Sequence, residues 1–412
     1  MLYPELTNDR SRRDAQAGLE EGVALAEALP GLEVVGASVV TLKKPDPGKL
    51  FGKGKLGELG ETFKANEVEL VLVDGPVSPV QQRNLEEAWG VKILDRTGLI
   101  LEIFSDRART REGVLQVEMA ALSYQRTRLV RAWTHLERQR GGLGFVGGPG
   151  ETQIEADRRA IDDQLTRLRR QLEKVSKTRA LHRSARAKVP YPIVALVGYT
   201  NAGKSTLFNR LTGADVMARD MLFATLDPTM RQIELPGGHK AILSDTVGFI
   251  SELPTQLVAA FRATLEEVLE ADLIVHVRDI SHPQSSEQAE DVEAILADLG
   301  VSDDVTRIEV WNKLDLLDDD ARAARLNEAE RREDVHAISA LSGEGLDELT
   351  SAIEAHLSRE ITETMLELPF AEGRKHAWLH GQGVVVAEQS GEDGWRITVR
   401  WNARQAAQYG AL

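Results

Sequence analysis

One stretch of the sequence constrains the fold more than any other: IVALVGYTNAGKST, residues 193–206. Five apolar residues that predict a buried strand run into a Gly-x-x-x-x-Gly-Lys-Ser motif, and a helix is expected immediately after it. The glycines allow backbone N–H groups to turn inward around phosphate oxygens, and the helix N-terminus favours the anion. The lysine reaches the β- and γ-phosphates, and the serine hydroxyl ligates Mg²⁺. The residues expected to form this phosphate loop are Gly198, Tyr199, Thr200, Asn201, Ala202, Gly203, Lys204, Ser205 and Thr206.

A second motif lies downstream, in the order expected of a nucleotide site. The apolar residues Ala241–Leu243 predict a strand, and an Asp-x-x-Gly motif follows at its end. A carboxylate here is positioned to hold Mg²⁺, usually through water, and the glycine N–H to contact the γ-phosphate. Asp-x-x-Gly alone is common in turns, so its place after the phosphate loop gives it weight. The residues expected to complete the phosphate and Mg²⁺ site are Asp245, Thr246, Val247 and Gly248.

The choice of base is indicated by Asn312-Lys313-Leu314-Asp315, which follows a strand predicted over Arg307–Trp311. The Asp315 carboxylate can accept hydrogen bonds from the N1–H and 2-amino groups of guanine, and adenine offers neither donor. We expect Asn312 to tie this pocket to the phosphate loop and the Lys313 stem to cover the base. A further short strand precedes Ser339-Ala340-Leu341, which fits a last base-contacting loop. A guanine nucleotide is therefore predicted.

Between these motifs lies a candidate switch segment, Phe223-Ala224-Thr225-Leu226-Asp227-Pro228-Thr229. A switch threonine ligates Mg²⁺ through its hydroxyl and contacts the γ-phosphate through its backbone, and both threonines qualify on chemistry alone. Phe249 stands where Ras-like proteins have a water-orienting glutamine. A phenyl ring cannot orient water, so we expect slow intrinsic hydrolysis. Asn201 could help a K⁺ ion bridge the phosphates, and the alternative is that it only hydrogen-bonds within its loop.

Composition and charge limit the possible partners. The 412-residue chain contains no cysteine, which excludes disulfides, thiolate zinc sites and thiol catalysis. Its formal net charge of −15 argues, taken alone, against nucleic acid as a partner. The charge is uneven, however: residues 1–105 carry −5, residues 106–188 carry +9 and residues 189–412 carry −19. A basic segment between acidic ones indicates a local surface for an anionic partner. With neither a secretory signal pattern nor a membrane-length apolar run, a cytoplasmic protein is expected.

The remaining patterns predict an α/β multidomain protein. Residues 1–110 alternate strands at 32–40, 68–75 and 91–95 with helices at Gly54–Ala65 and Val77–Ala88, which is typical of a small parallel sheet.

The other three predicted domains follow in order. Residues 111–188 carry two heptad seams around a glycine-rich loop and predict an antiparallel helical hairpin with arms of about 33 Å. A simple pair of solvated helices is the alternative. Residues 189–358 predict a P-loop domain with a mostly parallel sheet and helices on both faces, and residues 359–412 a small β-containing domain.

Two further groups of residues indicate no second site. The nine histidines form no metal cluster in the sequence, because His376 and His380 stand four apart without a carboxylate motif beside them. Gly52-Lys53-Gly54-Lys55 lacks the strand–loop–helix spacing of a phosphate loop and is interpreted as a basic turn. The alternative there is a second nucleotide site in an ATP-dependent remodeller.

Together the motifs resemble those of the HflX family, which are translation-factor-related GTPases. Beyond the nucleotide motifs, the resemblance rests on residues 95–104 and 107–118, on Gly147–Glu155 with Asp157–Arg159, and on Phe223–Pro228. It implies an N-terminal α/β domain, a helical arm and then a GTPase domain. It also implies binding to the large ribosomal subunit, with splitting of stalled ribosomes or a role in subunit maturation. The residues themselves predict GTP as the substrate, Mg²⁺ as its ion and K⁺ as a further candidate ion. By the match to the family's switch, Thr225 rather than Thr229 is the Mg²⁺ ligand beside Ser205 and Asp245. The expected catalytic residues are Thr225, Gly248, Asn201 and Lys204.

The basic hairpin is where we expect RNA to bind. Its arginines could meet RNA phosphates, its glycines allow close backbone approach, and its phenylalanine could stack on a base. The alternative for the arginines is solvation with ion pairs inside the hairpin. The alternative function is an RNA-modification or signalling GTPase whose arm binds a protein partner; a monomer is expected, and peripheral membrane association stays open. The expected RNA contacts are Arg126, Arg128, Arg131, Arg138, Arg140, Gly141, Gly142, Gly144 and Phe145.

Overall fold

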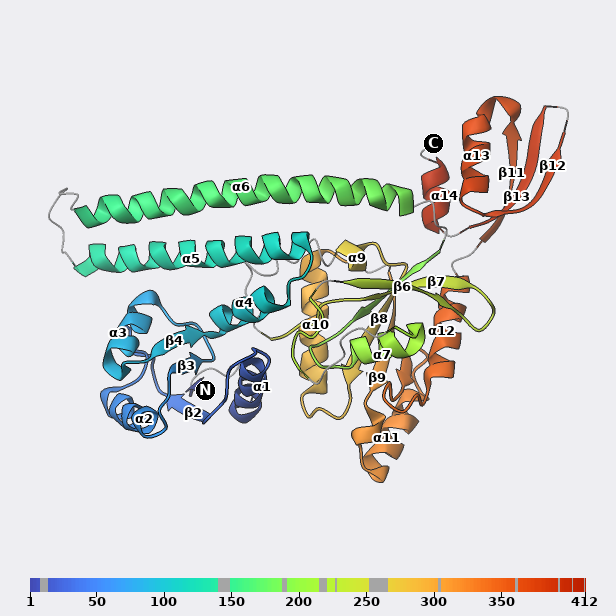
Figure 1. Ribbon diagram of the computed structural model, residues 1–412. Helices are drawn as coiled ribbons and strands as arrows, with labels where there is room; N and C mark the ends of the chain where they lie inside the picture. Colours follow the sequence, from blue (N-terminus) through green and yellow to red (C-terminus); the bar gives the residue numbers. More distant parts are fainter. Residues whose placement is uncertain are drawn as a thin grey trace. The chain divides into compact units, whose positions relative to one another are not determined.

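In the described part of the chain, a computed structural model shows three β-sheets, each built from a different stretch of sequence (Figure 1). The described residues fall into two compact units, and residues 221–226 belong to the same unit as Met1–Lys174. The structure describes residues 1–7, 14–139, 149–186, 191–214, 221–226, 228–251, 266–302, 305–359, 362–391, 393–401, 403–410 and 412.

The N-terminal sheet is parallel, with the strand order β2-β1-β3-β4. The strand predicted at 32–40 is displaced, because β2 begins only at Ser38, and β1 is a strand that the sequence patterns miss. Pro4 and Glu5 interrupt the apolar run of β1, which conceals it. Gly52 precedes α2, and the basic residues after it form the first turn of that helix. The elements are β1 (Leu2–Leu6), α1 (Ala15–Glu27), β2 (Ser38–Leu42), α2 (Lys53–Ala65), β3 (Leu70–Val73), α3 (Pro79–Trp89), β4 (Lys92–Asp95) and α4 (Arg96–Arg107).

The junction of β4 and α4 organises this unit. Asp95 caps α4 by accepting a hydrogen bond from the Gly98 N–H at 2.8 Å. The next residue, Arg96, is buried and pairs with Asp74 after β3 at 2.9 Å and with Glu21 on α1 at 2.5 Å. The carboxylates of Glu21 on α1 and of Asp74 after β3 thus meet the guanidinium of α4, so ion pairs as well as the apolar core join these segments.

Two long helices, α5 (Arg111–Gln139) and α6 (Pro149–Arg186), follow and form the predicted antiparallel pair (Figure 1). Arg126 on α5 and Asp162 on α6 join them through an ion pair of 2.8 Å. Both helices exceed the predicted arm of about 33 Å, since 29 and 38 residues rise about 43 and 57 Å. The sequence has neither proline nor glycine between residues 151 and 186, so nothing in it stops α6 earlier.

The central sheet has the order β10-β9-β8-β5-β7-β6, and all neighbours are parallel except β6 and β7. β5 has β7 on one side and β8 on the other, so the strand order reverses at β5. Open sheets of this kind bind ligands at the carboxyl end of the strand where the order reverses. Phe208 on α7 and Ile353 on α12 join its apolar core. The elements are β5 (Ile193–Val197), α7 (Lys204–Thr212), β6 (Thr229–Glu234), β7 (Lys240–Asp245), α9 (Glu266–Leu269), β8 (Leu273–Asp279), α10 (Ser285–Leu299), β9 (Thr306–Asn312), η1 (Leu314–Leu316), α11 (Asp319–Ala329), β10 (Val335–Ala337) and α12 (Leu346–Arg359).

The C-terminal sheet is antiparallel, with the order β11-β13-β12, and confirms the predicted β-containing tail. Leu379 of α13 is fully buried against Ile397 and Val399 of β13, which fixes the helix on the sheet. Of the described helices, none combines the length and apolar character that crossing a membrane requires. The elements are β11 (Thr362–Pro369), η2 (Phe370–Glu372), α13 (Gly373–Gly381), β12 (Val385–Ser390), β13 (Gly394–Trp401) and α14 (Ala403–Gly410).

Candidate functional site

The loop between β5 and α7 requires glycine at both ends. Gly198 has φ of 149°, and a Cβ there would lie 2.1 Å from the backbone oxygen of Val277 on β8. Gly203 has φ of 94°, and its Cβ would lie 2.1 Å from Nδ2 of Asn312. Both positions combine a left-handed conformation with no room for a side chain. The loop therefore follows a path that only this glycine spacing allows.

Lys204, the first residue of α7, is buried inside this loop. Its Nζ donates to the carbonyl oxygens of Gly198 at 3.0 Å and Tyr199 at 2.8 Å. Burial lowers the pKa of Lys204 to about 8, and the Asp245 carboxylate opposes part of that shift. An ammonium that is only partly compensated by neutral carbonyls is suited to receive an anion. The arrangement can bind phosphate at the N-terminus of α7.

Ser205 and Asp245 bring two oxygen ligands together. The Ser205 hydroxyl donates to Oδ2 of Asp245 at 2.7 Å, and Asp245 is fully buried at the end of β7. Thr246 anchors the same turn, because its hydroxyl donates to the Leu196 carbonyl at 2.6 Å. Hard oxygen donors from one hydroxyl and one carboxylate fit Mg²⁺, which keeps several of its waters and takes few protein ligands. These two residues could therefore hold the ion.

Gly248 and Phe249 lie against the phosphate loop. A Cβ on Gly248 would approach Cα of Thr200 to 2.8 Å and Nζ of Lys204 to 3.1 Å. The Phe249 N–H donates to the Gly198 carbonyl at 3.1 Å, and the Phe249 carbonyl accepts from the Thr200 N–H at 2.7 Å. The phenyl ring is buried, so Phe249 joins two loops rather than facing a water molecule. This contact of neighbouring backbones brings the two motifs together.

The base-recognition residues also converge. The Asn312 side chain donates to the Ala202 carbonyl at 2.8 Å and accepts from the Ala340 N–H at 2.9 Å. The Ser339 hydroxyl donates to the exposed carboxylate of Asp315. Lys313 has φ of 68° and pairs with Asp279 at 2.8 Å. Three sequence motifs are thus linked by direct hydrogen bonds.

Two neighbours of these residues differ in exposure. Leu314 is fully buried, and Leu341 leaves 72% of its surface exposed. The exposed leucine offers an apolar surface two residues after Ser339, the hydrogen-bond partner of Asp315, and a flat base binds well to such a surface. The buried side chain of Leu314 anchors the short helix η1, which contains Asp315, in the protein interior.

The switch segment packs on α4, a contact that the sequence patterns do not reveal. Phe223 is buried with φ of 55°, and its ring meets that of Phe104 edge to face at 4.6 Å. Arg107 contacts Sδ of Met221 at 3.1 Å. Thr225 and Leu226 are buried and Ala224 is half-buried, whereas Asp227 lies outside the described residues. Phe104 and Phe223 lie far apart in the sequence, so no local pattern indicates that their rings pack together.

The predicted RNA-contacting arginines separate into different groups. Arg126 forms the ion pair with Asp162 that joins the two helices, which favours the alternative of pairing within the hairpin. Arg128 is a correction: its guanidinium is only 20% exposed and pairs with Asp95 at 3.1 Å, with further hydrogen bonds to Tyr124 and Gln82. Arg128 joins α5 to the N-terminal sheet, because Asp95 is the last residue of β4 and also caps α4. The side chains of Arg131 and Arg138 lie outside the described residues, as do Arg140, Gly141, Gly142, Gly144 and Phe145.

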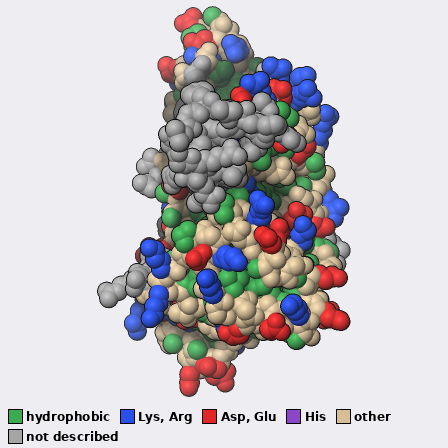
Figure 2. Space-filling model, turned by 90° about the vertical axis from the view of Figure 1, so that its left-hand side faces the viewer, with side chains coloured by type: hydrophobic (Ala, Val, Ile, Leu, Met, Phe, Trp, Pro, Cys, Tyr) green, Lys and Arg blue, Asp and Glu red, His purple; other side chains and the backbone are tan. Residues whose placement is uncertain are grey.

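The second helix of the pair carries exposed arginines that the sequence analysis passes over. They stand on α6, and Arg159 pairs only locally, with Glu155 at 2.9 Å. Figure 2 shows Lys and Arg side chains gathered in part of one face of the molecule, with Asp and Glu among them. Within the described ranges, these solvent-facing arginines form no ion pair with a residue distant in sequence, which leaves them available to phosphates. These residues are Arg158, Arg159, Arg167, Arg169 and Arg170.

The premise that no carboxylate accompanies the two neighbouring histidines does not hold in the structure. The sequence indicates no metal cluster because His376 and His380 lack a carboxylate motif, but Glu388 on β12 hydrogen-bonds to both rings. The folding of β12 against α13 brings the carboxylate into place, eight and twelve residues away along the chain. Spacing along one helix could not show this.

Comparison with known proteins places these motifs in a family. Four family models match: GTP-binding GTPase N-terminal over residues 16–105, GTP-binding GTPase Middle Region over 107–186, 50S ribosome-binding GTPase over 193–313, and HflX C-terminal domain over 324–410. The chain is 49% identical to the GTPase HflX of Magnetococcus marinus over 95% of this chain and 89% of that one. It is 43% identical to the GTPase HflX of Escherichia coli, covering 96% and 91%. It is 36% identical to a putative GTP-binding protein 6 of Xenopus laevis, covering 90% and 70%.

Proposed function

Because this chain belongs to the HflX family and is a P-loop GTPase, we propose that it uses GTP to act on the large ribosomal subunit, in splitting stalled ribosomes or in subunit maturation. The observation that carries the proposal is the match of residues 193–313 to a model described as a 50S ribosome-binding GTPase. The net charge of +9 over residues 106–188 supports an RNA partner. We propose four domains for this protein, at residues 1–110, 111–188, 189–358 and 359–412.

We assign nucleotide binding to the motifs that the structure brings together. Lys204 and the N-terminus of α7 bind the phosphates, and Asp315, with Ser339 beside it, selects guanine. Ser205, Asp245 and Thr225 would hold Mg²⁺, which supplies charge neutralisation at the β- and γ-phosphate oxygens when bound. Asn312 keeps the base loop and the phosphate loop in fixed register, and Gly248 donates its N–H to the γ-phosphate.

Hydrolysis is slow in this proposal until a partner or a cation assists it. The buried ring of Phe249 cannot orient water. The exposure of Asn201 in the phosphate loop, where its φ is 60°, supports a role for its side chain in assisting a bound K⁺ ion. GTPase rates measured in K⁺ and in Na⁺ buffers test this role, and equal rates would remove it.

Ribosome contact is assigned to the exposed arginines of α6 and to the tip of the hairpin. Reversing the charge of Arg167 and Arg170 together should weaken sedimentation with large subunits and flatten its salt dependence, because each phosphate contact releases counterions. Reversal of two exposed arginines elsewhere, Arg231 and Arg331, changes the net charge equally and is the control. Equal loss in both double variants, or in neither, would contradict the assignment.

The function itself is tested by sedimenting ribosomes with the full chain and GTP, GDP or a non-hydrolysable analogue. We expect nucleotide-dependent association with the large subunit that RNase abolishes. Conversion of stalled ribosomes to free subunits with GTP favours splitting, and binding confined to immature large subunits favours maturation. Association that persists after RNase points instead to a protein partner of the arm.

A further inference from the structure

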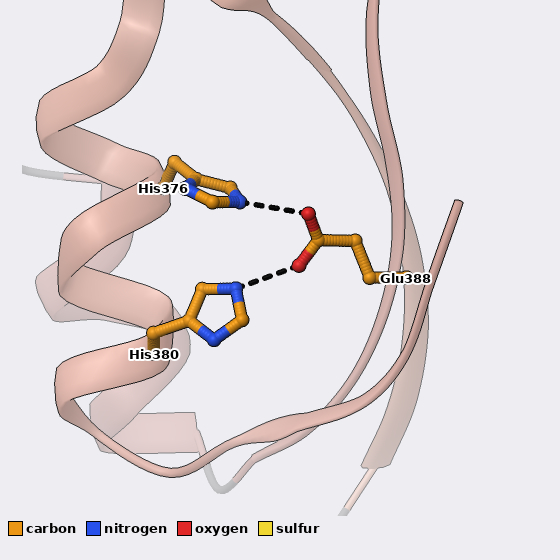
Figure 3. A group of neighbouring side chains, drawn as sticks. All are labelled: His376, His380 and Glu388. Atoms are coloured by element: carbon orange, nitrogen blue, oxygen red, sulfur yellow. Dashed lines mark hydrogen bonds and ion pairs between the residues drawn. The ribbon is translucent and has the colours of Figure 1, made fainter. Parts of the chain in front are cut away.

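A cluster of two imidazoles and one carboxylate lies in the C-terminal domain and contains none of the residues assigned to GTP (Figure 3). His376 and His380 are four residues apart on α13, so their side chains leave the same face of the helix. Glu388 projects toward them from β12. Nε2 of His376 lies 3.0 Å from one carboxylate oxygen, and Nε2 of His380 lies 2.6 Å from the other.

The geometry suits a metal ion of the zinc class. One ligand atom from each residue lies within 4.8 Å of the others, and zinc binds nitrogen and oxygen ligands at about 2.0–2.2 Å. Two imidazoles with one carboxylate favour borderline ions such as Zn²⁺ over Mg²⁺ or Ca²⁺, which prefer oxygen alone. The hydrogen bonds now join the same three groups that a cation would join. A bound metal ion would therefore take the place of the protons in these hydrogen bonds, with little movement of the three side chains.

The surroundings hold the ligands in place. The His376 ring stacks on Trp395 of β13 at 4.0 Å with an interplanar angle of 16°, and Trp395 meets Phe370 edge to face at 4.7 Å. Leu379, between the two histidines on the adjoining face of α13, is fully buried in the domain core. Ligands supported by neighbouring rings and by a packed helix lose little freedom when they bind an ion.

The cluster is also open to solvent. The side chains of His376, His380 and Glu388 are 23%, 48% and 24% exposed, which leaves room for an ion to enter and for water to complete its coordination. Glu388 offers a carboxylate oxygen to such an ion, and carboxylate oxygens are among the ligands that zinc binds.

From these contacts we infer that His376, His380 and Glu388 form a divalent transition-metal site, with Zn²⁺ as its expected occupant. Three protein ligands with open positions correspond to an exchangeable site rather than a closed structural one. The site adds a second, independent ion to a protein whose GTPase residues are suited to Mg²⁺.

The test uses untagged full-length protein saturated with Mg²⁺ and GDP, so that neither a histidine tag nor the nucleotide site takes up the probe. Co²⁺ is titrated and its visible absorption recorded, and Zn²⁺ is then added as competitor. We expect one equivalent of Co²⁺ to bind with the intensified bands of four- or five-coordination and to be displaced by Zn²⁺. His380→Gln and Glu388→Gln should each weaken binding by more than the about 10–100-fold that loss of an outer-shell group costs.

The matched control is His239→Gln. His239 pairs with Glu354 at 2.5 Å, so this variant removes an exposed imidazole–carboxylate pair that lacks a second histidine. Co²⁺ binding should remain unchanged in this variant, and GDP binding should remain unchanged in all three. Failure of the wild type to take up one saturable equivalent would overturn the inference, as would undiminished uptake by the His380 and Glu388 variants. In either case the cluster would be an ion pair that only ties α13 to β12.

Discussion

The phosphate loop and the helical pair α5–α6 carry positive charge in opposite ways. The loop concentrates its function in one buried ammonium, Lys204, whose neighbours are backbone carbonyls at 2.8 and 3.0 Å. In the pair, guanidinium groups of α6 lie on solvent-facing surface, whereas Arg128 on α5 is partly buried. A buried charge depends on a few atoms in fixed places, whereas exposed charges act together through a screened field. Single changes should therefore be severe in the loop and mild on the helices.

The largest effect is expected at Gly203. In Gly203→Ala the new Cβ overlaps Asn312 and the residue must keep a positive φ, terms worth about 1–3 kcal/mol each. We expect GDP affinity, measured by calorimetry, to fall by at least about 100-fold, because the loop must shift to relieve the overlap. Gly213→Ala, at the other end of α7, meets φ of 65° but open space. It should cost about 1–2 kcal/mol of stability and leave GDP affinity unchanged.

Base selection gives the next largest effect. Asp315→Asn removes the carboxylate that we propose accepts hydrogen bonds from two guanine donors, and a mismatch of this kind costs about 10⁴-fold in discrimination. The variant should lose its preference for GTP and gain affinity for xanthosine triphosphate, and competition binding measures both. Asp318→Asn is the control, since Asp318 only caps α11 through the Ala321 N–H at 2.8 Å. Strict GTP preference in the Asp315 variant would refute the assignment.

Arg128 and Arg126 compare a partly buried charge with an exposed one on the same helix. Arg128→Ala leaves Asp95 without its guanidinium partner, and we expect a loss of about 2–3 kcal/mol, below the 3–5 of a fully buried pair. Arg126→Ala breaks an exposed pair with Asp162 and should cost at most about 1 kcal/mol. Urea unfolding followed by circular dichroism measures both. Equal losses would show that exposure does not govern the value of these arginines.

The same contrast explains what the sequence could predict. The fold class and the convergence of Gly198, Asn312 and Asp245 follow from motifs in which each residue type has one backbone or ligand reason to be there. The helices α5 and α6 are predicted by periodicity, but the partner of Arg128 is not, because Asp95 lies 33 residues away and meets it only through tertiary packing. The contact of Glu388 with the two histidines and that of Phe104 with Phe223 could not be predicted for the same reason. Local patterns specify elements, and long-range contacts assign side chains to partners.

The smallest expected effect is the uptake of a fraction of a proton by Lys204 when nucleotide binds. With a pKa of about 8, Lys204 is partly neutral in the nucleotide-free protein, and a bound phosphate restores its charge. Binding of Mg²⁺ and GDP should therefore take up about three-quarters of a proton at pH 8.5 and about one-quarter at pH 7.5. Calorimetry in buffers of different ionisation enthalpy measures this uptake.

The sign of the stability effect follows from the same lowered pKa. Without nucleotide, the unfolded chain holds the extra proton between about pH 8 and the ordinary lysine value of 10.5, so this lysine makes the folded state more stable as pH rises through that window. Nucleotide should abolish this gain, because the phosphate keeps Lys204 charged in the folded state. Binding heats that do not depend on the buffer at pH 8.5 would show that the loop holds a fully charged lysine before any phosphate arrives. In that case Lys204 and the arginines of α6 would both be fully charged, and they would differ only in burial and position.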